Sequence, residues 1–199
     1  MISDEALYAR LLAGDEPALE SLLHRYHAPL LRFLYRHTGD PHRAEDLVQE
    51  TFARVVTYQG EPPRRFRAWA FTIAANLARD HLRSAYQRRE QPDPLQLGDE
   101  ASPLLTDAGP GADELALRSS DRREVVAALQ ALSASHREVV VLRFYHDMSL
   151  EEIAAVTGAP LGTVKSRLFH ALKHLKATLD PEGGQEHERA QTRRPGGRA

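Results

Sequence analysis

Along most of the chain, apolar residues recur at the three- and four-residue spacing of amphipathic α-helices, and no useful stretch alternates as a strand would. A short opening helix ends at Gly14, and a second helix begins at Asp15 and runs to about His37. A third helix begins at Asp40, and a long one covers residues 66–89. The pattern therefore predicts an N-terminal bundle of helices.

The same pattern divides the chain into two helical domains and two segments without regular structure. Residues 1–89 form the first predicted domain. Residues 90–112 are rich in proline, glycine and acidic residues, which predicts a flexible acidic linker. Helical periodicity returns over residues 113–179, the second domain, and residues 180–199 are predicted to be a disordered tail. The expected fold class is all-α, with two small helical domains on a tether.

The stretch MSLEEIAAVTGAPLGTVKSRLFHALKHL has the spacing of a helix-turn-helix. Two S-x-x-E capping boxes are predicted to open helices near it, one at Ser135 with Glu138 and one at Ser149 with Glu152. Gly158 is placed to take the left-handed conformation that ends the first helix of the motif.

The second helix of this motif carries two opposite stripes. Its core-facing stripe is apolar and consists of Val164, Leu168, Ala171 and Leu175. The opposite stripe combines cationic, hydroxyl, aromatic and imidazole groups, which suit phosphates and base edges in a major groove. The alternative is a solvated cationic face on a plain helical hairpin. The members of this second stripe are Lys165, Ser166, Phe169, His170 and Lys173.

Charge is distributed unevenly along the chain, although the formal net charge is only −2. Residues 62–89 hold seven arginines against one acid, and residues 153–179 hold four basic residues and no acid. Between them, residues 90–117 contain seven acids and no lysine or arginine. Two basic surfaces with an acidic spacer suggest two contacts with one polyanion.

Composition excludes several kinds of site and of membrane association. The absence of cysteine excludes disulfides, thiolate metal sites and a cysteine nucleophile. His170 and His174 have metal-ligand spacing but no third ligand nearby in sequence, so we expect neither a metal nor another cofactor. The N-terminus lacks the apolar segment of a signal peptide, and the longest apolar run is too short to cross a bilayer, so we expect a cytoplasmic protein without membrane insertion.

The N-terminal half has a basic surface of its own. On the long helix, Asn76, Arg79 and Arg83 line one face, and the preceding loop YQGEPPRRFRAW joins aromatic side chains to arginines. That combination suits stacking on unpaired bases beside a phosphate backbone. Trp69 and Phe71 fit a core position better than a base platform, whereas the loop tyrosine could serve either purpose.

The helix that begins at Asp40 offers a different surface. Its polar residues gather on one side, and apolar residues are available to pack inward on the other. From spacing alone, this polar face is either solvated or a protein-binding surface. Its members are Asp46, Gln49, Glu50 and Arg54.

Taken in order, the segments AEDLVQETFARV and FRAWAFTIAANLARDHLR, the acidic linker and the helix-turn-helix resemble a bacterial RNA polymerase sigma factor. The resemblance is to the extracytoplasmic-function type (ECF, group IV) of the sigma-70 family, and it covers nearly the whole chain. It implies that residues 1–89 are sigma region 2, a helical bundle that binds core polymerase and recognises and melts the −10 element. It also implies that residues 113–179 are region 4, which reads the −35 element.

The resemblance assigns roles to matching residues. The polar face of the third helix would grip the clamp helices of the polymerase's largest subunit, through Asp46, Gln49, Glu50 and Arg54. The −10 residues would be Tyr58, Arg64, Arg65, Arg67, Asn76, Arg79 and Arg83. The −35 residues would be Thr163, Lys165, Ser166, Arg167, Phe169, His170 and Lys173. Expected partners are core RNA polymerase, including its flap region, promoter DNA and an anti-sigma factor.

Two positions depart from the family pattern. Lys165 and His170 stand where the family often has arginine. A lysine is a point charge without the bidentate fork of arginine, and a histidine attracts phosphate less. We therefore expect the −35 preference or the salt dependence of this chain to differ from the family's usual behaviour.

Two other functions are weighed against this one. A stand-alone helix-turn-helix transcriptional regulator would protect duplex DNA without polymerase. An enzyme such as a metal-dependent nuclease lacks support, because the sequence has no clustered carboxylates and no HExxH motif. We expect a non-enzymatic factor whose acidic linker covers its basic surfaces until polymerase separates the domains. Neutralising Glu90, Asp93, Asp99 and Glu100 tests that last hypothesis.

Overall fold

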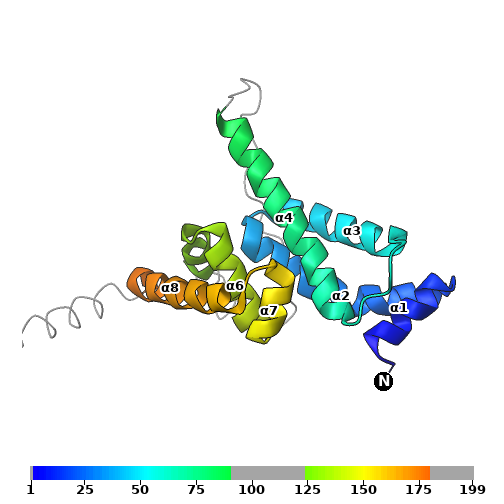
Figure 1. The fold of residues 1–199 in the computed structure, drawn as a ribbon. Coiled ribbons are helices and arrows are strands. Elements are labelled where there is room, and N and C mark those ends of the chain that lie inside the picture. The colour runs from blue at the N-terminus through cyan, green and yellow to red at the C-terminus, as the bar shows by residue number, and fades with distance from the viewer. Residues whose placement is uncertain (1, 91–123, 180–199) are drawn as a thin grey trace, which may run out of the picture.

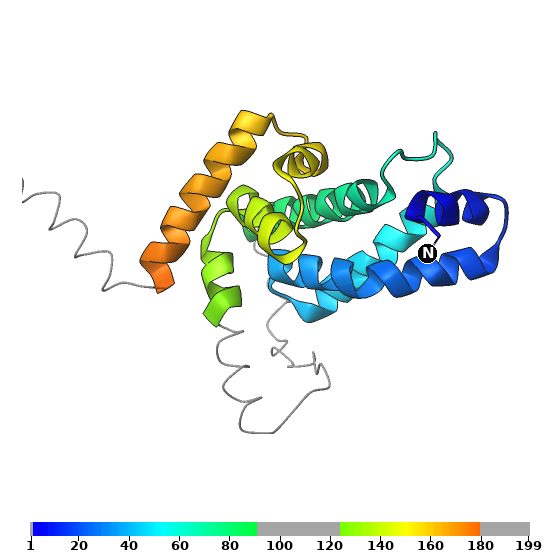
Figure 2. The same cartoon turned by 90° about the horizontal axis from the view of Figure 1, so that it is seen from below.

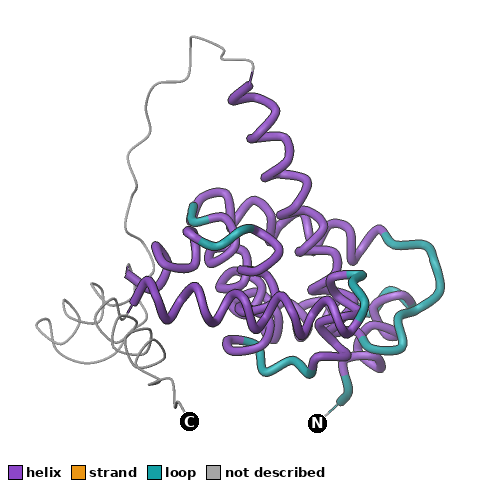
Figure 3. Tube along the Cα trace, turned by 60° about the vertical axis from the view of Figure 1, so that its left-hand side comes forward, coloured by secondary structure: helices purple, strands orange, loops and turns teal. Residues whose placement is uncertain are grey.

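The computed structural model describes residues 2–90 and 124–179, and these fold into α-helices joined by short loops (Figures 1 and 3). Within these two ranges there is no strand, and the predicted all-α class is confirmed. Residues 124–131 are helical as well. The helices are α1 Asp4–Leu12, α2 Glu16–Thr38, α3 Pro41–Thr57, α4 Phe66–Glu90, α6 Ala134–Tyr145, α7 Leu150–Thr157 and α8 Leu161–Leu179.

Most of the predicted helix ends are present. Gly39 ends α2 with φ 79°, and the Asp40 carboxylate accepts a hydrogen bond from the Arg43 amide at 3.0 Å to cap α3. Ser149 and Glu152 form the complete capping box at the start of α7, with bonds of 2.9 and 3.1 Å. These local signals set the helix boundaries because each needs only a few neighbouring residues.

The capping box predicted at Ser135 and Glu138 is wrong. α6 begins two residues earlier, and the hydroxyl of Ser133 accepts a hydrogen bond from the His136 amide at 3.4 Å. Ser135 lies within the first turn of α6, and Glu138 is 1% exposed inside the protein. The same four-residue pattern therefore occurs twice, but only Glu152 caps a helix, whereas Glu138 is buried in the protein.

The N-terminal bundle is formed by α1 to α4 around a core of aromatic and aliphatic side chains. α2 packs against α1, α3 and α4, and α3 packs against α4. Phe33, Phe66 and Phe71 are fully buried there, so the expected core position of Phe71 is confirmed. Burying one such side chain contributes about 1.5–3 kcal/mol. This core holds α3 and α4 in fixed positions, with their polar faces outward.

The C-terminal helices pack around α8. Both α6 and α7 contact α8, and Val164 and Ala171 on α8 are fully buried with Ile153 of α7. At the turn, Gly158 has φ 67°, as predicted, and ends α7. The amide of Val164 donates to the Pro160 carbonyl at 3.0 Å, which begins α8. The motif therefore presents one side of α8 to the outside.

The two halves are packed against each other, with α7 on α4 and α6 on α2 (Figures 1 and 2). Buried residues of both halves belong to one continuous core. Most of the linker and the start of the second predicted domain, residues 91–123, lie outside the described residues, as does the tail at 180–199. The hypothesis that the acidic linker covers basic surfaces therefore stays a prediction.

Candidate nucleic-acid interfaces

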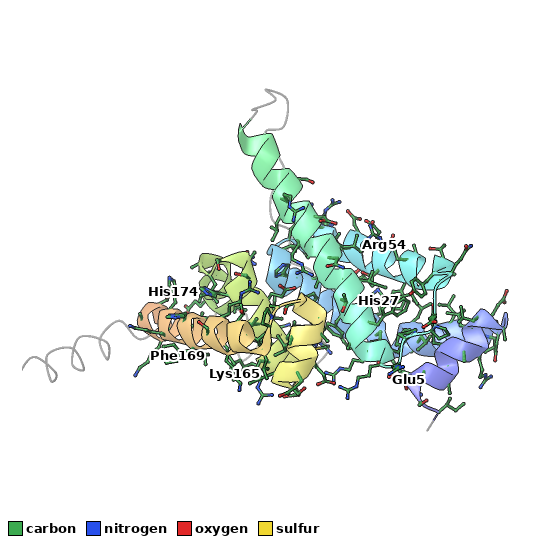
Figure 4. All side chains as sticks on the ribbon, in the orientation of Figure 1. Glu5, His27, Arg54, Lys165, Phe169 and His174 are labelled. Atoms are coloured by element: carbon green, nitrogen blue, oxygen red, sulfur yellow. The ribbon has the colours of Figure 1, made fainter. Side chains whose placement is uncertain are left out.

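The outer stripe of α8 is exposed as the sequence pattern indicates. Lys165, Ser166, His170 and Lys173 are all exposed, and Phe169 is 66% exposed. Figure 4 shows Lys165 and Phe169 along α8. An aromatic side chain that projects into solvent between two lysines suits apolar contact with a base edge beside phosphate contacts.

Two further −35 candidates lie differently. Thr163 and Arg167 are only partly exposed. Arg167 faces inward far enough to lower the pKa of Glu138, against the larger effect of burial. Arg167 therefore lies at the partly buried edge of the exposed stripe of α8.

The polar face of α3 forms a second exposed surface. Asp46, Gln49 and Glu50 are exposed, and Arg54 bonds to Glu50 at 2.7 Å along the helix. The inward side of α3 is buried as the pattern predicts, through Leu47, Val48, Phe52 and Val55. Figure 4 shows Arg54 on a part of the molecule separate from Lys165.

An aromatic-walled hollow lies at the end of this face, where α3 leads through a loop into α4. It has a volume of about 370 Å³. The rings of Tyr58 and Trp69 meet there edge to face, with centroids 4.9 Å apart, and Asn76 contributes an amide. Trp69 is only half-buried, so the expectation that it is a core residue holds for one side of its ring. The other lining residues are Arg54, Thr57, Gln59 and Ile73.

The predicted −10 arginines divide into two groups. Arg64, Arg65 and Arg83 are exposed, and Arg67 is exposed too but contacts the C-terminal half. Arg67 donates a hydrogen bond to the carbonyl of His146, and Arg79 donates to the carbonyl of Thr157 at 3.1 Å. The second group therefore contacts the C-terminal half.

Arg79 also faces a buried carboxylate. Its Nε lies 3.9 Å from Oε1 of Glu138, which is too far for a hydrogen bond, and that oxygen has no hydrogen-bond partner. Burial raises the pKa of Glu138 to about 7, while Arg79 and Arg167 oppose the shift. The unfavourable burial outweighs the long-range attraction, because no donor satisfies the charge directly.

Two buried histidines complete the contact between the halves. His37 stacks on Phe33 with ring centroids 5.8 Å apart, and His146 packs on Phe71 at 4.8 Å. Burial, reinforced by the charges of nearby arginines, lowers the pKa of each to about 3. Both rings are therefore neutral at physiological pH. Sequence reasoning missed them, because nothing in the local pattern separates a buried histidine from an exposed one.

Comparisons with known proteins now decide the family. The model of "Sigma-70 region 2" matches residues 22–89, and that of "Sigma-70, region 4" matches residues 128–177. The ECF RNA polymerase sigma factor SigL of Mycobacterium tuberculosis is 38% identical over 177 residues, covering 86% of this chain and 94% of SigL. The chain is an ECF sigma factor of the sigma-70 family. As such it directs transcription initiation, and the alternative of a stand-alone regulator is set aside.

Solved structures of sigma factors share this fold. CnrH, in complex with the cytosolic domain of CnrY, is 29% identical and matches 90% of this sigma factor and 98% of the CnrH chain, with a TM-score of 0.63. RpoE, in complex with the anti-sigma factor NepR from Bartonella quintana, is 26% identical and matches 82% of this sigma factor and 97% of the RpoE chain, with a TM-score of 0.61.

Two observations concern other kinds of site. Across residues 2–90 and 124–179, no group of three or more His, Asp or Glu side chains could hold a metal ion. In the same part of the sigma factor, no helix combines the length and the apolar character needed to cross a bilayer.

Proposed function

We propose that this sigma factor holds a promoter at two places. Region 4 reads the −35 element as duplex through the exposed stripe of α8, and region 2 captures unpaired bases of the −10 element beside Tyr58 and Asn76. The observation that carries the proposal is the pairing of a basic, aromatic stripe on α8 with a separate aromatic-walled hollow next to exposed arginines. The first suits a groove and the second suits a single base.

Core RNA polymerase is the proposed protein partner. The exposed face of α3, with Asp46, Gln49, Glu50 and Arg54, docks on the clamp helices of the largest subunit, and region 4 lies near the flap. The proposal is supported by the position of this polar face on a helix whose other side is fully buried. Exposed charges at such a surface set orientation and association rate more than affinity.

The chain itself performs no covalent chemistry in this scheme, and it works beside polymerase in the cytoplasm. It lowers the cost of unpairing by binding the exposed strand better than the duplex, while polymerase supplies the catalytic centre. An anti-sigma factor is a further proposed partner, supported by the solved relatives, which are bound to CnrY and NepR.

Promoter opening requires the halves to separate. Arg67 and Arg79 donate to carbonyls of the C-terminal half, so neither guanidinium can contact DNA fully while those bonds persist. Binding to polymerase therefore has to exchange contacts within the chain for contacts with DNA, and the free sigma factor should bind promoters poorly.

Transcription in vitro tests the function directly. Purified sigma factor and core polymerase are incubated with a genomic library, and the start sites are sequenced. The proposal predicts a set of start sites that share two elements, together with permanganate-reactive thymines near −10. If core polymerase starts at the same sites with and without the sigma factor, the proposal is wrong.

Paired variants separate the two contacts. Replacing Lys165 and Lys173 by Ala should weaken duplex binding, because each removes a phosphate contact. Replacing Asn76 by Ala should leave the −35 footprint in place and reduce permanganate reactivity. If both variants lose the −35 footprint and the permanganate reactivity equally, the assignment of the two elements to separate surfaces is wrong.

A further inference from the structure

Trp69 packs against buried rings on one side and against a partly exposed ring on the other. Its inner side packs against the buried rings of Tyr8 and Phe66, with centroids 5.2 and 5.8 Å away. Tyr8 is itself fixed, because its hydroxyl donates to the Val55 carbonyl at 3.3 Å. The outer neighbour of Trp69 is Tyr58, which is 38% exposed and comes directly after the last residue of α3.

The Tyr58 ring lies over Gly60, and only a glycine leaves room for it. A Cβ atom at position 60 would stand 2.6 Å from Cζ and 3.1 Å from Cε1 of Tyr58, and nearer still to the hydroxyl oxygen. Such distances are far inside van der Waals contact. Any side chain at position 60 therefore forces the ring to move.

We propose that Gly60 is a positioning residue for promoter opening: it lets the Tyr58 ring lie on Trp69, so that the two rings form the wall against which an unpaired base stacks. The inference rests on the proposed function and adds a residue that touches no DNA. It follows from the close approach of the ring to Gly60, the edge-to-face pair, and the hollow that this pair lines.

The steric clash that a side chain at position 60 would cause can be relieved by moving only the Tyr58 ring. Tyr58 sits in an exposed loop, so its ring can swing into solvent without disturbing the buried core beneath Trp69. Gly60→Ala should therefore displace the ring and open the wall of the hollow while the protein stays folded.

Fluorescence of the free, full-length protein tests the first step. Trp69 is the only tryptophan in the chain, so the fluorescence emission reports how well the Trp69 ring is shielded from water. Gly60→Ala and Tyr58→Ala should both shift the emission to longer wavelength, because Trp69 loses its outer neighbour. Gly162→Ala is the matched control, since a Cβ there meets nothing within 4 Å, and it should leave the emission unchanged.

Promoter opening tests the second step. Holoenzyme is assembled from core polymerase and full-length sigma factor on a promoter found by start-site mapping with the wild type. Gly60→Ala should reduce permanganate reactivity near −10 about fivefold or more, which is what loss of one base–aromatic stack gives. The −35 footprint should stay unchanged, because α8 is unaffected.

The double variant shows whether Gly60 acts through Tyr58. In a Tyr58→Ala background, Gly60→Ala should cause no further loss of opening, because the ring it would displace is gone. Additive losses, an unshifted emission or full opening by Gly60→Ala would each overturn the inference. Absence of any opening by the wild type would instead contradict the proposed function, so the two failures are distinct.

Discussion

Arg79 donates a hydrogen bond from Nη1 to the backbone carbonyl of Thr157, 3.1 Å away, across the contact between α4 and α7. The same guanidinium bonds to Asn76 at 2.5 Å and faces the buried carboxylate of Glu138. One arginine of the expected −10 surface thus bonds to the residue where α7 of the helix-turn-helix ends. The Arg79 guanidinium that bonds to Thr157 in the free protein is also the group expected to contact −10 DNA.

Replacing Arg79 by Met should destabilise the free sigma factor by about 1–2 kcal/mol, because one hydrogen bond between the halves is lost and Glu138 loses its cation. Urea unfolding at pH 7.5, on the order of half a unit above the Glu138 pKa, measures the change. Arg83→Met is the control, since Arg83 is exposed on the same helix. Equal stabilities of the two variants would show that the bond to Thr157 contributes nothing.

Glu138 should make stability fall as pH rises. Its pKa is raised from 4.5 to about 7 in the folded protein, so the folded state holds a proton that the unfolded state has released. The stabilisation is complete below pH 4.5 and is lost as pH rises through 7; its full size is about 3 kcal/mol. Glu138→Gln should remove this dependence, measured by urea unfolding between the two pH values.

The control for this pH dependence is Glu151→Gln, because Glu151 is exposed at the start of α7. That variant should keep the wild-type dependence on pH. If Glu138→Gln has the same pH profile as the wild type between 4.5 and 7, the buried carboxylate is not the group that titrates.

Arg137 connects the helix ends on both sides of the contact between the halves. It is 7% exposed and donates to the carbonyls of Leu129, Gln130 and Leu132 at 2.9–3.0 Å. It also donates to the carbonyl of His37 at the end of α2. Burial lowers the pKa of its guanidinium, and the surrounding carbonyls accept hydrogen bonds from its N–H groups. No carboxylate is paired with it among the described residues.

Arg137→Lys should therefore cost about 2–4 kcal/mol of unfolding free energy. A lysine keeps the charge but cannot reach carbonyls in several directions, so buried acceptors lose their donors. Arg143→Lys is the matched control, because Arg143 is exposed and makes one bond, to the Met148 carbonyl at 2.8 Å. Thermal unfolding of both variants compares them, and similar midpoints would contradict the role given to Arg137.

Local signals in the sequence predicted much of the fold, and long-range contacts account for what was missed. Gly158 and Ser149 were predictable because a helix end depends on a few adjacent residues. Arg137 and Glu138 were not, since their environment is built by α2, α4 and α8, which are distant in sequence. The exposed stripe of α8 followed from periodicity, whereas the aromatic hollow needed the path of the loop before α4.

The N-cap of α6 can be tested directly, because the structure places it at Ser133 and the sequence pattern placed it at Ser135. Ser133→Ala should cost about 0.5–1 kcal/mol, because the α6 amide of His136 loses its acceptor. Ser135→Ala should change stability by less than about 0.5 kcal/mol, since Ser135 makes only a 3.4 Å contact between hydroxyls. Chemical unfolding of the two variants decides between them. A larger cost at Ser135 would restore the cap expected from the sequence pattern.

Lys165 and His170 should affect promoter binding in different ways. His170→Arg adds a permanent charge to the exposed stripe of α8, so holoenzyme should bind the −35 duplex more tightly, with a salt slope steeper by about 0.9 for one added phosphate contact. Lys165→Arg keeps the charge and should leave the slope unchanged, while its bidentate fork strengthens the preference for guanine at the contacted base pair. Binding of a mapped promoter and its −35 variants at several salt concentrations measures both effects. An unchanged slope for His170→Arg would place that side chain away from the phosphates.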